Sequence, residues 1–150
     1  MGKHLQRDLD RIKKELLTTG LMEEKALNDS IESLVDRHPE LAKAVILGDR
    51  SIDQKENQIE EECLKVLALH HPVANDLRFV IAVLKFNNDL ERMGDLAANI
   101  AERSIYLESH EPLQAVLNFH HMADRVQAMV SKSLDALIRM DIKLAQLVLT

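Results

Sequence analysis

The stretch from Pro72 to Glu108, PVANDLRFVIAVLKFNNDLERMGDLAANIAERSIYLE, decides the fold class. Its proline stands first, which suits a helix start because a residue there needs no N–H partner. The apolar residues behind it recur at the three- and four-residue intervals of one helix face, and they are Leu77, Val80, Val83, Leu84, Leu90, Met93, Ala97 and Ile100. The pattern predicts one long helix over 72–108.

Helical periodicity continues on the N-terminal side of this stretch. One helix is predicted over about 4–37, with Gly20 allowing a bend. His38-Pro39 ends it, because proline cannot join a helix interior. The period then restarts and runs to about His70, with Gly48-Asp49 as a kink or a cap.

On the C-terminal side, Glu111-Pro112 predicts a further break, and a fourth helix follows. Its apolar residues are Val116, Phe119, Ala123, Val126, Val130, Leu134, Leu137 and Ile138. No segment shows the two-residue alternation of a strand. Three or four long helices with short connections predict an all-α antiparallel bundle.

The composition agrees with helices and limits the functions. Hydrophobic residues make up 46% of the 150 residues but aromatic residues only 3%, so the core must be aliphatic. A net charge of −6 without a basic stripe argues against nucleic-acid binding, which needs clustered Lys and Arg. The single Cys63 cannot form an internal disulfide, and no apolar run reaches the roughly 18 residues that span a bilayer. We therefore expect a cytoplasmic protein without a transmembrane segment.

Acidic side chains form two stripes at helical spacing. Asp49, Asp53 and Glu56 are separated by four and three residues, and Glu91 and Asp95 by four. Such spacing places carboxylates on one helix face, and two antiparallel neighbours with these stripes can bring hard oxygen ligands together. A solvated face explains the same spacing, so the residues alone leave metal binding open.

The sequence contains no catalytic motif of a familiar type. No histidine stands three residues after a glutamate, as in ferritin-like di-iron enzymes, and there is no His-Glu-x-x-His zinc motif. Cys63 has apolar neighbours at helical spacing, which indicates core packing. Two alternatives stay open for the acidic stripes, a carboxylate-bridged metal-dependent helical enzyme and a metal-storage bundle.

The chain matches itself at an offset of 103 residues, which indicates an internal repeat. The matching pairs are Ser30 with Ser133, Ile31 with Leu134, Leu34 with Leu137, Val35 with Ile138, Leu41-Ala42 with Leu144-Ala145, and Val45-Ile46 with Val148-Leu149. At the junction between the helices, His38 falls on Asp141. We expect one three-helix unit over 1–110, and over 111–150 the first helix and part of the next of an incomplete second unit.

Two stretches of the chain resemble the PhoU family of phosphate-uptake regulators. One is DRSIDQKENQIE over 49–60, and the other is PVANDLR over 72–78, followed by DLERMGDLAANIA over 89–101. The repeat of that family is a three-helix bundle with a Glu/Asp-x-x-x-Asp motif on its second and third helices. Asp49-x-x-x-Asp53 and Glu91-x-x-x-Asp95 match the two motifs.

The resemblance implies a function and a ligand set. Members of the family are non-enzymatic negative regulators of the phosphate regulon, which link the Pst transporter ATPase to a PhoR-type sensor kinase. They reach the membrane only peripherally, through such partners. Some members bind multinuclear iron or zinc clusters, or magnesium-like ions, at the acidic motifs. The ligand set implied here consists of Asp49, Asp53, Glu56, Glu91 and Asp95.

Members of the family usually carry two complete repeats, so we expect this chain to end within its second repeat. A fourth helix without its bundle partners exposes an apolar stripe that includes Val116, Val126, Leu134 and Leu137. Exposed apolar stripes tend to be covered by another surface. We therefore expect a homodimer or a higher oligomer, joined through the region after Leu113.

Overall fold

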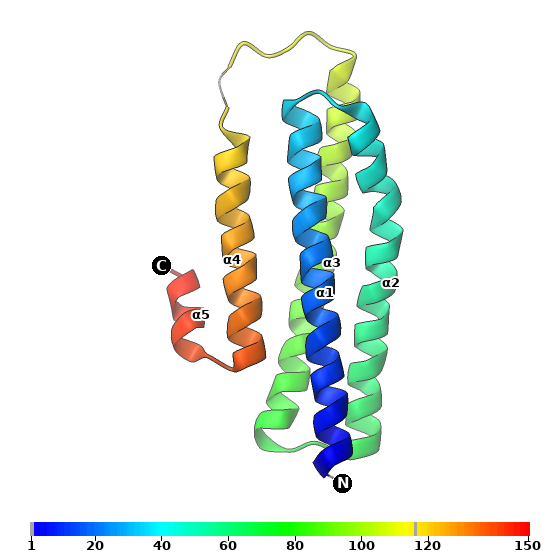
Figure 1. The fold of residues 1–150 in the computed structure, drawn as a ribbon, viewed down its shortest axis with the longest axis vertical. Coiled ribbons are helices and arrows are strands. Elements are labelled where there is room, and N and C mark those ends of the chain that lie inside the picture. The colour runs from blue at the N-terminus through cyan, green and yellow to red at the C-terminus, as the bar shows by residue number, and fades with distance from the viewer. Residues whose placement is uncertain (1, 116) are drawn as a thin grey trace.

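The computed structural model describes residues 2–115 and 117–150, and its regular elements are helices (Figure 1). In chain order they are α1 (Gly2–Val35), α2 (Pro39–His70), α3 (Ala74–Glu108), α4 (Phe119–Arg139) and α5 (Ile142–Val148). The predicted all-α fold is confirmed, and no strand occurs among the described residues. Of the helices described, none combines the length and the hydropathy that a bilayer span requires.

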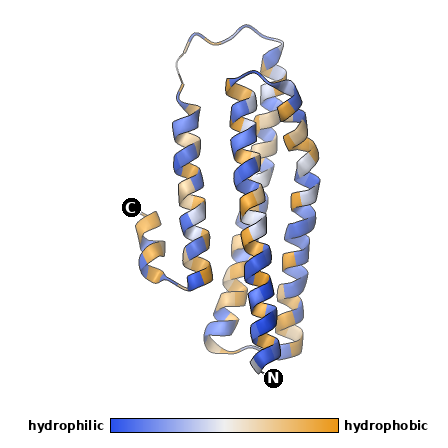
Figure 2. Cartoon of the chain, in the orientation of Figure 1, coloured by the Kyte–Doolittle hydropathy of each residue, from blue (hydrophilic) through white to orange (hydrophobic). Residues whose placement is uncertain are grey.

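The first three helices pack as an antiparallel bundle, and α4 lies against α1 with little contact to α3 (Figure 1). Polar and apolar residues are interleaved along the helices, so each long helix can bury one face (Figure 2). The buried core is mainly aliphatic and consists of Leu9, Ile12, Leu16, Ile59, Cys63, Val66, Phe79, Val80, Val83, Leu90 and Leu134. Because Leu134 belongs to α4, the fourth helix is tied to the core of the bundle.

Gly20 lies where α4 approaches α1. A Cβ atom at Gly20 would lie 2.6 Å from Cδ2 of Leu134, so a side chain here would force Leu134 to shift. Nε2 of Gln127 also donates a hydrogen bond to the backbone oxygen of Glu24 at 3.3 Å. Gly20 was predicted to allow a bend, but the structure gives it a packing role within an unbroken helix.

The junction between α1 and α2 depends on His38. Arg37 adopts a left-handed φ of 54°, and the N–H of His38 donates to the backbone oxygen of Ser33 at 2.9 Å. Nδ1 of His38 then accepts a hydrogen bond from the N–H of Leu41 at 3.1 Å. The imidazole therefore caps the N-terminus of α2.

The junction between α4 and α5 has the same hydrogen bonds at an offset of 103 residues. Met140 has a φ of 53°, and the N–H of Asp141 donates to the backbone oxygen of Ala136 at 2.8 Å. Oδ1 of Asp141 accepts from the N–H of Leu144 at 3.0 Å and caps α5. The two junctions share one local geometry at the positions that the self-comparison aligned.

Some predicted boundaries differ from the structure. α2 runs through Gly48-Asp49 as one helix, so these residues do not cap a helix end, because one glycine in a helix interior costs only about 1 kcal/mol relative to alanine. α3 begins at Ala74 and not at Pro72, since His71 ends α2 in a left-handed conformation. The predicted helical position of Val116 lies outside the described residues.

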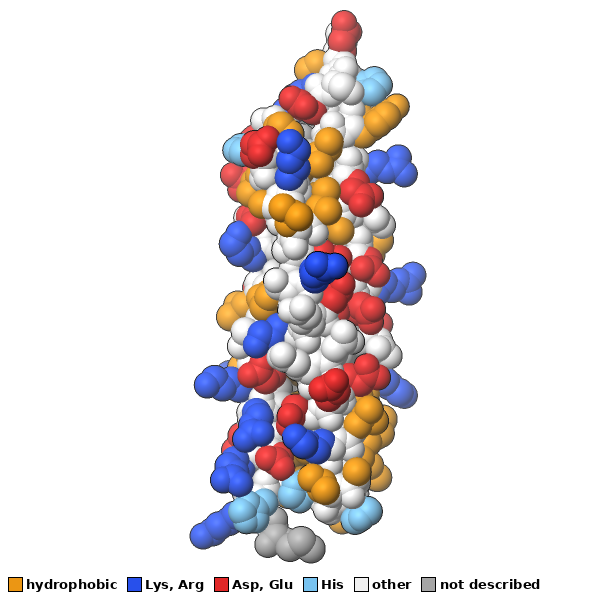
Figure 3. All heavy atoms as spheres, turned by 90° about the vertical axis from the view of Figure 1, so that its right-hand side faces the viewer, with side chains coloured by type: hydrophobic (Ala, Val, Ile, Leu, Met, Phe, Trp, Pro, Cys, Tyr) orange, Lys and Arg blue, Asp and Glu red, His pale blue; other side chains and the backbone are white. Residues whose placement is uncertain are grey.

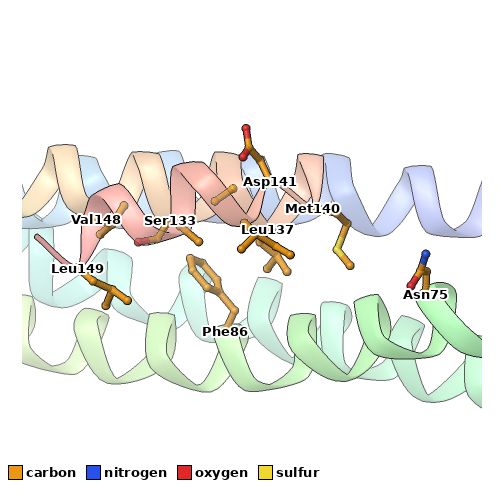
Figure 4. Close-up of a pocket in the computed structure, with 11 residues that line it drawn as sticks. Asn75, Phe86, Ser133, Leu137, Met140, Asp141, Val148 and Leu149 are labelled. Atoms are coloured by element: carbon orange, nitrogen blue, oxygen red, sulfur yellow. The ribbon is translucent and has the colours of Figure 1, made fainter.

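An apolar groove of about 630 Å³ lies between α3, α4 and α5 (Figure 4). Phe86 of α3 points across it toward Leu137 of α4. Met140, Ile142 and Leu149 are among the other residues that line it. The groove is therefore an apolar recess lined by residues of three helices.

Candidate metal centre

Three carboxylates form a group on the outside of the bundle, which we call the outer triad: Asp49 and Asp53 of α2, and Asp95 of α3. When one oxygen atom is taken from each, all three atoms lie within 4.8 Å of one another. Asp49 and Asp53 are half-buried and Asp95 is exposed. Acidic side chains gather at mid-height on this side of the molecule (Figure 3). The oxygen spacing suits one cation coordinated by all three residues.

Helix geometry explains how the outer triad forms. Asp49 and Asp53 are one turn apart, so both project from the same side of α2. α2 and α3 pack against each other extensively in antiparallel directions, which brings Asp95 beside them. The structure thus brings together three of the residues expected as ligands.

The other two expected ligands, Glu56 and Glu91, are not part of the outer triad. Glu91 is exposed on α3, one turn before Asp95. Glu56 is only 3% exposed and lies inside the bundle. The acidic stripe of α2 therefore divides into two outer carboxylates and one interior carboxylate.

A further interior carboxylate, Glu23 of α1, was not identified from the spacing of acidic residues. It is 1% exposed, and neither of its carboxylate oxygens has a hydrogen-bond partner among the described residues. Glu23 stands seven residues after Leu16, so it lies on the same buried face of α1. A charged residue in the register of an apolar stripe is the sequence signal that identifies it.

Gly94 of α3 leaves the space that the Glu23 carboxylate occupies. A Cβ atom at Gly94 would lie 2.7 Å from Oε1 of Glu23 and 3.3 Å from Oδ1 of Asp49. The missing side chain therefore lets Glu23 lie against the α3 backbone, next to an oxygen of the outer triad. The glycine that precedes Asp95 is part of the site.

Glu23 and Glu56 form what we call the inner pair. Burial raises the pKa of Glu23 well above its ordinary value, and the adjacent Glu56 carboxyl adds to this effect. Burial also raises the pKa of Glu56, and the charges of Asp53, Glu91 and Asp49 act in the same direction. The pKa of Asp49 is raised by burial and by its two partners in the outer triad. Negative charge is therefore unfavourable at Glu23, Glu56 and Asp49, and a cation beside them would be stabilising.

The donor atoms fit a divalent cation. The outer triad offers only carboxylate oxygens, which suit magnesium and manganese and are also accepted by zinc and iron. The inner pair adds four buried carboxylate oxygens that have no hydrogen-bond partner among the residues that the structure describes. Unpaired buried charge is costly, and a coordinated cation removes much of that cost.

Comparison with known proteins places the chain in a family. The model of the family described as "PhoU domain" matches residues 16–104. The chain belongs to the PhoU family. The resemblance carried by residues 49–60 and 89–101 is thereby confirmed, and both acidic motifs lie inside the PhoU match.

PhoU relatives match nearly the whole chain. The phosphate-specific transport system accessory protein PhoU homolog of Aquifex aeolicus is 38% identical over 145 residues, which cover 97% of this chain and 66% of the relative. The homolog of Pseudomonas aeruginosa is 38% identical over 146 residues, covering 97% and 60%. The PhoU protein of Escherichia coli is 32% identical over 148 residues, covering 95% and 61%. The chain thus spans less than two thirds of the length of these relatives.

Two solved PhoU structures have the same fold. The crystal structure of PhoU from Pseudomonas aeruginosa has a TM-score of 0.87 at 39% identity, covering 94% of this chain and 68% of that one. The phosphate transport system regulatory protein PhoU from Streptococcus pneumoniae also has a TM-score of 0.87, at 29% identity, covering 96% and 68%. The predicted PhoU-like fold is confirmed.

Proposed function

We propose that this chain is a non-enzymatic accessory protein that negatively regulates phosphate uptake and phosphate-regulon signalling. The observation that carries the proposal is the similarity to relatives named as accessory proteins of phosphate-specific transport, at 38% identity over 97% of the chain. The relative from Streptococcus pneumoniae is named as a regulatory protein, which supports the same role.

In this proposal the chain is an adaptor between the Pst transporter ATPase and a PhoR-type sensor kinase. Support comes from its net charge of −6 and from the acidic face around the outer triad, which offers a docking surface to a basic patch on a partner. The chain works in the cytoplasm and reaches the membrane only through these partners.

The outer triad binds a divalent cation, which is iron, zinc or magnesium. Asp49, Asp53 and Asp95 are the ligands, and their oxygen spacing supports this assignment. Glu91 adds a further carboxylate on the same face of α3, one turn before Asp95. The cation joins α2 to α3 and fixes the shape of the docking face.

We also propose that 1–110 is one PhoU repeat and that 111–150 begins a second. The matching junctions at His38 and Asp141 support this division, since both the caps and the backbone hydrogen bonds recur at the offset of 103 residues. On this basis α4 corresponds to α1, and α5 corresponds to the start of α2.

A second copy of the chain covers the apolar groove between α3, α4 and α5 in this proposal. Ile142 is 73% exposed and Leu149 is 86% exposed, and both line the groove. Burying such side chains stabilises an interface by about 25 cal/mol per Å² of apolar surface. The chain is therefore a homodimer or a higher oligomer.

Direct binding tests the adaptor role. The immobilised chain should bind both the Pst ATPase and the cytoplasmic part of the sensor kinase, and the Asp53→Asn/Asp95→Asn variant should bind more weakly by about tenfold, since charge pairs at an interface contribute on this order. Asp10→Asn/Asp124→Asn removes the same charge from exposed positions of α1 and α4 and should bind like the wild type. A folded chain that binds neither partner contradicts the proposal.

A further inference from the structure

Apolar side chains lie exposed on the face that carries the outer triad, nearer to the turn between α2 and α3. Leu64 of α2 is 53% exposed, and Leu77 and Ile81 of α3 are each 39% exposed. We call these three residues the apolar strip. Figure 3 shows apolar side chains below the acidic ones on the same side of the molecule. Contiguous exposed apolar residues mark contact sites, whereas single ones are ordinary.

Helix geometry places the apolar strip and the outer triad on one face. Leu77 stands 18 residues before Asp95, which is five full turns of α3, so both residues project in the same direction. Leu64 stands 11 residues after Asp53, which is close to three turns of α2. The strip therefore continues the face of the triad on both helices.

A hydrogen bond between α2 and α3 fixes their register. Nδ2 of Asn87 donates to the backbone oxygen of Glu56 at 2.9 Å. Because the two helices are antiparallel, Leu64, eight residues after Glu56, is level with the position eight residues before Asn87. That position lies between Leu77 and Ile81, so the three residues of the strip share one height, about 20 Å along the bundle from the outer triad.

The strip lies on a different side of α3 from the apolar groove that is proposed to bind a second copy. Phe86 lines that groove and stands five residues after Ile81. Five residues turn a helix by about 140° beyond one full turn, so the two side chains leave α3 in very different directions. A second copy in the groove leaves the strip open.

The charges around the strip describe the partner. On α2, Glu60 stands one turn before Leu64 on the same side, and the outer triad lies farther along. This acidic row attracts basic groups and repels an anionic membrane. The exposed Arg78 and Lys85 lie on the outer side of α3, so the opposite edge of the partner is acidic or neutral.

We propose that the seam between α2 and α3 binds an amphipathic helix of a partner protein, with apolar residues on the strip and Lys or Arg toward the outer triad. Side-chain ridges of packed helices accept a further helix in this way. A helix of about four turns spans the distance from the strip to the triad. The inference rests on the proposed adaptor role and names the kind of segment that the chain recognises.

Matched variants remove the strip without changing the charge of the chain. Leu77→Ser/Ile81→Ser removes its two residues on α3, and Leu64→Ser repeats the test from α2. Leu17→Ser/Leu21→Ser is the control, because these leucines of α1 have the same four-residue spacing and are 43% and 65% exposed. All five side chains are partly exposed, so far-UV circular dichroism should show unchanged helicity.

Binding of the immobilised chain to the Pst ATPase and to the cytoplasmic part of the sensor kinase tests the inference. We expect Leu77→Ser/Ile81→Ser to weaken binding of one partner by about tenfold or more, because apolar anchors carry much of the energy of an interface. Asp53→Asn/Asp95→Asn should weaken the same partner, and Leu17→Ser/Leu21→Ser should bind both like the wild type.

The possible results separate the inference from the adaptor role. Unchanged binding by both strip variants overturns the inference and leaves the adaptor role standing. If the strip and the aspartates affect different partners, one helix does not cover both, and the inference is again overturned. A folded wild type that binds neither partner overturns the adaptor role and the inference together.

A photo-crosslinker on an introduced cysteine identifies the bound segment. Asn88→Cys lies on α3 between Ile81 and Asp95, and Asn28→Cys on α1 is the control, since both asparagines are exposed. Cys63 is buried, which raises its pKa to about 12, so the label goes to the introduced thiol. We expect Asn88→Cys to capture a partner peptide with apolar residues three or four apart and with Lys or Arg. Capture of a segment without this pattern, or of a second copy, overturns the inference.

Vesicles of phosphatidylglycerol and phosphatidylcholine test a lipid surface as the occupant of the strip. We expect the chain to stay in solution when the vesicles are sedimented. Sedimentation of the wild type that is lost in Leu77→Ser/Ile81→Ser would assign the strip to a membrane and overturn the inference.

Discussion

At the scale of single residues, Gly94 and Glu23 determine what the acidic site can hold. The glycine has no Cβ, and the glutamate carboxylate lies 2.7 Å from the point where that atom would be. Through Glu23, α1 therefore contributes a carboxylate next to the outer triad, whose own residues belong to α2 and α3.

Gly94→Ala and Gly48→Ala should differ in stability, although both replace a glycine within a helix. Each gains about 1 kcal/mol of helix propensity. A Cβ at Gly48 meets no atom within 4 Å, whereas a Cβ at Gly94 displaces the Glu23 carboxylate. We expect Gly94→Ala to be less stable than Gly48→Ala by about 1–2 kcal/mol, the usual cost of overpacking. Urea unfolding measures both, and equal free energies of unfolding would contradict the packing seen at Gly94.

The raised pKa values of the inner pair predict how the stability of the metal-free protein depends on pH. Both carboxyls bind protons more tightly in the folded than in the unfolded state, so their contribution is largest at low pH and is lost as pH rises through the folded pKa. The free energy of unfolding should fall by several kcal/mol, on the order of 3–6, between about pH 5 and pH 8.

Urea unfolding of the stripped protein at several pH values checks this dependence. Glu23→Gln should flatten it, because the carboxyl with the largest rise in pKa no longer titrates. Asp8 acts in the opposite sense, since its hydrogen bond with His70 lowers its pKa, but its contribution changes below this range. Stability that rises steadily from pH 5 to pH 8 would contradict a buried acidic pair.

At the scale of elements, the junctions hold the bundle in register. Arg37 follows the end of α1, and its Nη2 donates to the backbone oxygens of Leu107, Glu108 and His110 at 3.2, 2.8 and 2.7 Å. These oxygens belong to the C-terminus of α3 and the residues after it, where a cation is favourable. The Arg37 side chain thus connects the junction between α1 and α2 to the C-terminal end of α3.

Arg37→Met should destabilise the chain by about 1–2 kcal/mol, because hydrogen bonds from a charged donor are lost. Arg139→Met is the matched control, since Arg139 makes an exposed pair with Asp135, and such pairs contribute less than about 1 kcal/mol. Thermal or urea unfolding measures both variants. Equal losses in the two would contradict the tie between Arg37 and α3.

The helices and the outer triad could be predicted because both follow from the helical period. Asp49 and Asp53 are one turn apart, and only the antiparallel packing of α2 and α3 was needed to add Asp95. The place of Glu23 in the site was not predicted. A glutamate is normally assigned to the surface, and only the structure shows that this one lies on the buried face of α1. The cap proposed as one alternative at Gly48-Asp49 was wrong, because one glycine lowers helix propensity too little to end α2 there.

At the scale of the whole molecule, the apolar groove between α3, α4 and α5 is open to solvent. Its lining includes exposed apolar side chains such as Ile142 and Leu149. Phe86 and Val148 line both this groove and a neighbouring depression of about 320 Å³ between α3 and α4. The two recesses together form one apolar surface. The proposed self-association would therefore depend on α3, α4 and α5 together and not on one helix.

Ile142→Glu should shift the chain toward the monomer. The new charge lies in the groove, where burial against a second copy would be unfavourable. Leu47→Glu is the matched control, since Leu47 is 78% exposed on α2 and does not line the groove. Light scattering over a wide concentration range measures both, and a wild-type chain that is monomeric throughout would contradict the proposed association.

The central claim, that the chain regulates phosphate uptake, is tested most directly by a reporter gene under a phosphate-regulon promoter. The host should be a bacterium that lacks its own PhoU protein, grown with abundant phosphate. The account predicts that the chain lowers reporter expression, that Asp53→Asn/Asp95→Asn does so less, and that Asp10→Asn/Asp124→Asn equals the wild type. Reporter expression that stays equally high when the folded chain is present would contradict the claim.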